Sequence, residues 1–207
     1  MNFSATALIG ALVYLIAAPL IGGLLAGADR IISARMQGRY GPPLLQPFYD
    51  VLKLWQKETI AVNRQQKVYV LSFFVFVIIA GCIMFSGGDL LLAVFALTLA
   101  GVFLIIAAYS TFSPYAHIGA EREMLQMVSY EPMVILTIVG MYMATGSFSS
   151  LEIARHDGTL FLSLPFIFLG FLFILTIKFR KSPFDISMSH HAHQEIVRGL
   201  TTEFSGR

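Results

Sequence analysis

The sequence predicts an all-α, polytopic membrane protein that has about five transmembrane helices and one amphipathic helix in the membrane interface. Of its 207 residues, 57% are hydrophobic and only 13% are charged, whereas about a quarter of the residues of soluble domains carry a charge. The hydrophobic residues form long continuous runs, and the basic residues gather in alternate polar segments. Long apolar runs predict membrane-spanning helices, and the uneven basic charge predicts their orientation.

Each apolar run has roughly 18 or more residues, enough to cross the ~30 Å hydrocarbon layer as a helix. Continuous runs exclude a closed β-barrel, whose strands alternate apolar and polar residues. The first run has no basic segment before it and contains Pro19, so we interpret it as a kinked span and not as a signal peptide. No repeat or linker divides the chain, which predicts one membrane domain over residues 1–207. The predicted spans cover residues 5–26, 68–86, 90–110, 124–146 and 159–178.

The polar segments differ in charge. All but one of the 14 Lys and Arg residues lie in, or at the edge of, the segments 27–67, 111–123 and 179–207, and the exception is Arg155. Because basic loops are retained on the cytoplasmic side of a membrane, we expect these three segments to be cytoplasmic and the N-terminus to be outside. The formal net charge of only +2 gives no reason to expect a nucleic-acid partner.

The first cytoplasmic segment contains an amphipathic helix. Between residues 44 and 55, large apolar side chains recur at intervals of three and four residues, and Asp50, Lys53 and Lys57 are placed toward water. Such a helix lies in the plane of the membrane interface. Its simplest interpretation is a surface anchor.

The same segment also carries a resemblance. The stretch "GRYGPPLLQPFYDVLKLWQKE" (residues 38–58) resembles the first loop of a membrane subunit shared by respiratory complex I, where it forms the subunit-one family, and energy-converting NiFe hydrogenases. The resemblance implies that this segment docks the peripheral half of such a complex. The docking residues that it implies are Arg39, Gln46, Asp50, Lys53 and Glu58.

A length argument places one carboxyl group inside the membrane. A helix from Pro132 to residue 145 would measure only ~21 Å at 1.5 Å per residue, which is too short to span. We therefore expect this helix to begin near Met124, with Pro132 as an internal kink and Glu131 ~10 Å inside. An ionisable group at such a depth costs roughly 2.5–3.5 kcal/mol and normally faces the bundle interior or water. Glu131 is our candidate for proton transfer, and the alternative is a carboxylate that Arg122 simply neutralises.

The stretch "GAEREMLQMVSYE" (residues 119–131) is similar to the same family's third cytoplasmic loop and fourth helix. The resemblance implies that Glu131, together with Arg122, lines a buried path of charged residues that leads toward antiporter-like subunits. The neighbouring Glu121 and Glu123 depart from the family pattern, and we expect them to be solvated charges.

The stretch "RKSPFD" ends the fifth span, where we expect Arg180 and Lys181 to face the inner headgroups and Pro183 to stop the helix. The polar residues that follow resemble the family's loop after the fifth helix. Where complex I has several acidic residues, this chain has "SHHAHQE", which is typical of Ech-type and CO-induced hydrogenases. Three histidines so close together can bind a metal, but no cysteine joins them, so we favour a proton relay. The titratable residues assigned to the ion pathway here are Asp185, His190, His191, His193, Glu195 and Glu203.

The resemblance implies an integral, membrane-anchoring and ion-coupling subunit of an energy-converting NiFe hydrogenase in the cytoplasmic membrane of a prokaryote. Such a complex links ferredoxin or H2 electron transfer to H+ or Na+ translocation. The chain itself would be non-catalytic and hold no cofactor or metal, and the NiFe centre and iron–sulfur clusters would belong to partner subunits. Those partners are the large and small hydrogenase subunits, a ferredoxin-like iron–sulfur subunit and an antiporter-like membrane subunit.

Two alternatives remain open. In the first, the chain is the quinone-site subunit of complex I. In the second, it is a purely structural anchor without an ion path. Because no sixth span follows the last polar segment, we also expect the chain to be truncated at its C-terminus relative to the family.

Overall fold

The computed structural model describes residues 5–58, 63–180, 183–188, 199–202 and 204, and these residues are almost entirely helical. The described part contains no strand beyond an isolated antiparallel bridge between Asp89 and Ser149. The helices, in chain order, are α1 (Ala5–Met36), α2 (Gln46–Trp55), α3 (Arg64–Phe85), α4 (Leu90–Tyr109), α5 (Pro114–Thr145), α6 (Ser150–Ala154), α7 (Leu160–Ser163), α8 (Pro165–Lys178) and the 3-10 helix η2 (Gly199–Thr201).

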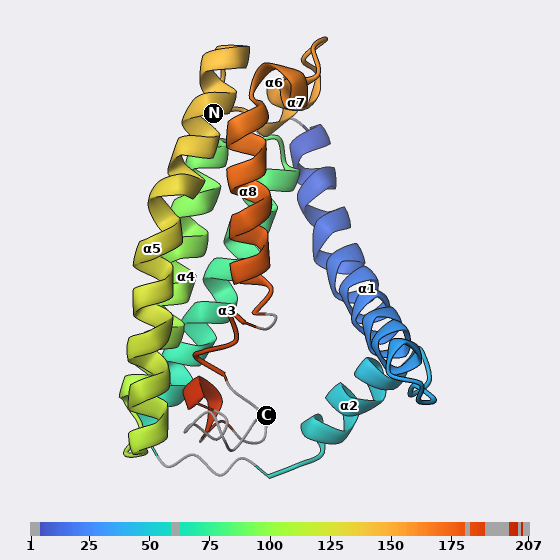
Figure 1. Ribbon diagram of the computed structural model, residues 1–207, viewed down its shortest axis with the longest axis vertical. Helices are drawn as coiled ribbons and strands as arrows, with labels where there is room; N and C mark the ends of the chain where they lie inside the picture. The colour runs from blue at the N-terminus through green and yellow to red at the C-terminus, as the bar shows by residue number, and fades with distance from the viewer. Residues whose placement is uncertain (1–4, 59–62, 181–182, 189–198, 203, 205–207) are drawn as a thin grey trace.

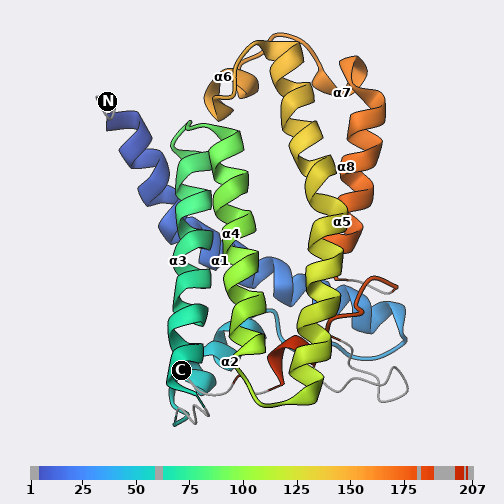
Figure 2. The same cartoon turned by 90° about the vertical axis from the view of Figure 1, so that its left-hand side faces the viewer.

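Four of these helices, α1, α3, α4 and α5, are long and apolar enough to cross a membrane, and α8 is a shorter apolar helix of 14 residues. The predicted class, an all-α polytopic membrane protein, is therefore confirmed. The helices α3, α4 and α5 stand side by side, and α8 runs along α5 (Figures 1 and 2). In Figure 1, α1 leans away from this group, and α2 lies beside the lower end of α1.

The last apolar run does not form the single helix expected over residues 159–178. The chain breaks at Leu164, which has φ −132° and ψ 54°, and α8 starts at Pro165. Proline lacks an amide proton and disfavours the helical conformation of the residue before it, so the run divides into α7 and α8. The continuous span predicted from hydropathy is wrong at this point.

Helix α5 begins ten residues earlier than we expected, because Pro114 rather than Met124 is its first residue. Pro114 fits the first helical turn, where its missing amide proton leaves no bond unmade. The small residues Ala116, Gly119 and Ala120 are buried in the added turns, so packing sustains the helix beyond its apolar run. The loop predicted over 111–123 is thus mostly helical, whereas the internal position of Pro132 is confirmed.

The amphipathic helix α2 packs against the end of α1 at two glycines. A Cβ atom on Gly27 would overlap the backbone carbonyl of Leu44, and one on Gly23 would overlap the ring of Phe48. Because a backbone carbonyl cannot move aside as a flexible side chain can, Gly27 fixes how closely the two segments approach.

We predict that Gly27→Ala separates α2 from α1 and destabilises the reconstituted chain by about 1–3 kcal/mol, the usual range for overpacking. Gly22→Ala is the matched control, because a Cβ atom there meets nothing within 4 Å. Thermal unfolding of the two variants in nanodiscs checks this, and equal melting temperatures would contradict it.

Candidate ion-coupling site

The carboxyl group of Glu131 on α5 meets the hydroxyl of Thr98 on α4. The Thr98 hydroxyl lies within hydrogen-bonding distance of both Glu131 Oε1 and the carbonyl of Val94, which is 2.9 Å away. A hydroxyl has one proton to donate and lone pairs that accept. Thr98 can therefore donate to an ionised Glu131, or accept from a protonated Glu131 while donating to Val94. The contact satisfies the carboxyl group in either protonation state.

The position of Thr98 shows how deep this contact lies. Helix α4 has 20 residues, from Leu90 to Tyr109, and measures ~30 Å at 1.5 Å per residue, the thickness of the hydrocarbon layer. Thr98 is eight residues from the first end and eleven from the second, or ~12 and ~16 Å. Glu131 thus lies level with the middle of a spanning helix, deeper than the length argument suggested.

Lys178, in the last turn of α8, extends over the face of Tyr130. Its Nζ lies 4.8 Å from the centre of the Tyr130 ring, a distance at which an ammonium ion is attracted to the aromatic face. Tyr130 directly precedes Glu131, so a cation from α8 stands beside the carboxyl-bearing turn of α5. Sequence reasoning missed Lys178 as a site residue, because a lysine that ends an apolar helix is ordinarily a headgroup anchor.

Arg122 does not neutralise Glu131 directly. The two residues are nine positions apart on one helix, or ~13 Å along its axis, and Arg122 donates to the carbonyl of Ile186 at 3.4 Å. One turn further along, Gln126 donates to the carbonyl of Phe184 at 2.9 Å. The first turns of α5 therefore hold the segment that follows α8.

Glu123 is not the solvated charge that we expected. Its Oε1 lies 2.5 Å from Arg180 Nη2, its Oε2 accepts a hydrogen bond of 2.5 Å from the Ser187 hydroxyl, and its side chain is only 12% exposed. Arg180 likewise faces this carboxylate and not a headgroup. Nothing in the residue pattern indicated this pair, because its partners are 57 residues apart.

The remaining pathway candidates are less well placed. Asp185 is half-buried in the segment held by α5. The other candidates lie outside the described residues, and they are His190, His191, His193, Glu195 and Glu203. Within the described part of the chain, no three His, Cys, Asp or Glu side chains gather as a metal site.

The predicted docking residues divide into two groups. Asp50 accepts hydrogen bonds from Arg30 of α1 at 2.8 Å and from Gln46 at 2.9 Å, so Asp50 and Gln46 help to fix α2 on α1. Arg39, Lys53 and Glu58 are exposed, and Arg39 contacts Gln37. Exposed charges of this kind are available to a partner.

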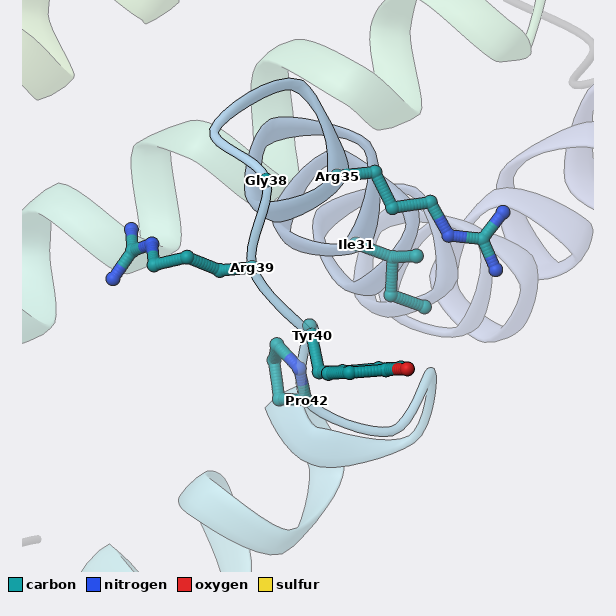
Figure 3. A pocket seen from close by; sticks show the side chains of 7 residues that line it. Ile31, Arg35, Gly38, Arg39, Tyr40 and Pro42 are labelled. Carbon is teal, nitrogen blue, oxygen red and sulfur yellow. The ribbon is translucent and has the colours of Figure 1, made fainter.

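An open hollow of about 460 Å³ lies at the turn between α1 and α2. Tyr40 and Ile31 line it, and Figure 3 shows Arg35 and Arg39 extending to opposite sides of the turn. Because the two guanidinium groups do not converge, the hollow offers no single anion site.

The contact between Arg30 and Asp50 makes the seating of α2 sensitive to acid. Hydrogen bonds from Arg30 and then Gln46 hold the pKa of Asp50 below its ordinary value of 3.8. A carboxylate whose pKa is lowered by folding contributes stability above the ordinary pKa and loses it as the pH falls through the lowered value. We therefore predict that α2 stays seated near neutral pH and loosens below pH 3.8.

Fluorescence of Trp55, the single tryptophan of the chain, checks this prediction in the reconstituted chain, because Trp55 ends α2. Asp50→Asn is the control, since it should show no acid transition of this kind. An identical transition in both proteins would assign it to another group.

The comparisons with known proteins agree with this architecture. Residues 9–207 match the profile of a family described as NADH dehydrogenase. A subunit of the NADH-quinone oxidoreductase of Dehalococcoides mccartyi is 32% identical over 200 residues, which cover 86% of this chain and 55% of the relative. Formate hydrogenlyase subunit 4 of Escherichia coli is 29% identical over 218 residues, which cover 96% of this chain and 68% of the relative. The chain thus spans little more than half the length of the first of these relatives.

A solved structure shows the same fold. One chain of the membrane-bound sulfane sulfur reductase, an archaeal respiratory membrane complex, superimposes with a TM-score of 0.84 and 29% sequence identity. The match covers 97% of this chain and 70% of that chain. Subunits of an NADH-quinone oxidoreductase, a formate hydrogenlyase and a sulfane sulfur reductase are therefore all similar to this chain.

Proposed function

Because the chain belongs to the NADH dehydrogenase family, we propose that it is the membrane-anchoring, ion-coupling subunit of an energy-converting NiFe hydrogenase complex. Its general place, a membrane subunit of a multisubunit respiratory or hydrogenase-type complex, follows from its relatives. Membrane subunits of this family lack redox centres, so electron transfer belongs to partner chains. The finer assignment rests on the "SHHAHQE" segment and on the similarity to formate hydrogenlyase subunit 4.

The observation that carries the ion-coupling role is the contact between Glu131 and Thr98 near the middle of α4. A carboxyl group in the hydrocarbon layer is expensive unless it has a polar partner, and this partner can bond either protonation state. A group that is satisfied both with and without its proton can load and release that proton. In our proposal the path continues past Lys178 and Tyr130 toward Arg122, Asp185 and the histidines of the cytoplasmic segment.

We expect the peripheral hydrogenase to sit on the cytoplasmic face. The exposed residues Arg39, Lys53 and Glu58 supply charges for docking there, and in this proposal the N-terminus is on the outer side of the membrane. Its partners in this proposal are the two hydrogenase subunits, an iron–sulfur subunit and an antiporter-like membrane subunit, in the cytoplasmic membrane of a prokaryote.

We predict that Glu131→Gln abolishes H+ or Na+ translocation by the assembled complex, because an amide cannot carry a proton. Dye-linked hydrogenase activity should persist, since the electron path lies in other subunits. Ion uptake by inverted membrane vesicles checks this. Glu152→Gln, an exposed carboxylate in α6, is the matched control and should pump normally. Unimpaired pumping by the Glu131 variant would refute the role.

The second candidate is the quinone-site subunit of complex I, which the 32% identity to the NADH-quinone oxidoreductase subunit of Dehalococcoides mccartyi favours. The two candidates differ in the metal that copurifies. We predict stoichiometric nickel and a ferredoxin-like subunit in the complex isolated through a tag on this chain, as measured by metal analysis and peptide mass spectrometry. A nickel-free complex that contains flavin would establish the quinone-linked alternative.

A further inference from the structure

Arg180 has a backbone conformation that residues with a side chain rarely adopt. Its φ is +48°, and it is the only such non-glycine residue in the described part of the chain. A left-handed residue of this kind persists only where the contacts around it impose the conformation. The strain therefore points to an interaction that holds Arg180 in place.

That interaction is the ion pair with Glu123. Both oxygens of the Glu123 carboxylate are engaged, one by Arg180 and the other by the Ser187 hydroxyl. The side chains of Glu123 and Arg180 are 12% and 30% exposed, and Ser187 is fully buried. A charge pair shielded from water in this way is much more strongly coupled than a pair on the surface.

The pair fixes more than one turn of the chain. The carbonyl of Ser187 accepts a hydrogen bond of 3.1 Å from the amide of Leu200, at the start of η2. Leu200 is fully buried against Ile105, Ala108 and Ala120, and η2 lies between the cytoplasmic ends of α4 and α5 (Figure 2). The contact is close because Gly119 has no Cβ atom, which would overlap the amide nitrogen of Leu200.

From these contacts we infer that Glu123 and Arg180 form a latch, a pair of positioning residues that holds residues 183–188 and 199–202 against α5. The inference rests on the proposed function, because α5 also carries Glu131, eight residues or ~12 Å from Glu123 along the helix. A docked partner that draws the segment away from α5 must break this ion pair, which frees Arg180 from its strained conformation. The latch thereby couples the position of the cytoplasmic segment to the helix that carries the membrane carboxyl group.

Hydrogen exchange at the amide of Leu200 measures the latch directly in the complete purified complex. We expect Glu123→Gln to raise the exchange rate about tenfold, because a hydrogen-bonded charge pair is lost. The matched control is Glu121→Gln, which neutralises an exposed carboxylate two residues away on the same helix and should leave the rate unchanged. The charge-swapped protein, Glu123→Arg with Arg180→Glu, should recover at least part of the protection.

A second variant separates the ion pair from the turn. Arg180→Gly fits the left-handed conformation without strain but has no guanidinium group, so it should exchange as fast as Glu123→Gln. Normal protection in either single variant would overturn the latch. The latch would also be overturned if the amide of Leu200 exchanged as fast in the charge-swapped protein as in the single variants.

The role in coupling has its own measurement. Glu123→Gln should lower the number of ions moved per H2, with dye-linked hydrogenase activity unchanged, and an unaltered ratio would reduce the latch to a structural contact and overturn the inference. A failure of the proposed function gives a different result, namely normal ion translocation by Glu131→Gln. That variant leaves the ion pair between Glu123 and Arg180 intact, so it should not change hydrogen exchange at Leu200.

Discussion

A carboxyl group in the hydrocarbon layer needs a polar partner, and the contact between Glu131 and Thr98 meets that need. Ionisable side chains at this depth are tolerated where another polar group or water faces them. Here the partner comes from the neighbouring helix, so α4 and α5 must remain side by side with their facing turns in register. The fully buried small residues Ala108 of α4 and Ala120 of α5 belong to one packed cluster, and a Cβ atom on Gly101 of α4 would lie 3.3 Å from the sulfur of Met127 on α5. The polar contact and the helix packing therefore depend on each other.

The length of α5 links the interior of the membrane to the face on which the segment after α8 lies. Its 32 residues extend ~48 Å, well beyond a ~30 Å hydrocarbon layer. Near its first end, α5 bears Glu123 and Gln126, which bind the segment after α8, and further along it bears Glu131. One helix, which contains Pro132 internally, thus carries both the residues that bind the segment after α8 and the carboxyl group proposed to carry the proton. Packed contacts along one helix are a route by which two distant sites can be coupled.

The fold class and the internal position of Pro132 were predictable, because both follow from the length of apolar runs and the thickness of a bilayer. The start of α5 was not, since Gly119 and Ala120 lie in a polar stretch and are buried by tertiary contacts with α4 and η2 that the sequence does not reveal. Glu123 was misread for a similar reason. A carboxylate that has other charged residues beside it in the sequence is ordinarily predicted to be solvated. Its partner Arg180 is distant in the sequence and reaches it through a left-handed turn. Thr98 left no signal at all, because a threonine in an apolar run is common and its contact with Glu131 is tertiary.

The central claim is that Glu131 exchanges a proton during turnover. Infrared difference spectroscopy of the reconstituted complex, recorded between its oxidised and H2-reduced states, tests this most directly. The account predicts a carbonyl band of a protonated carboxyl group that changes between the two states, shifts in D2O and is absent from Glu131→Gln. An identical difference spectrum in the variant would show that Glu131 keeps one protonation state, and the proposed proton path would have to run elsewhere.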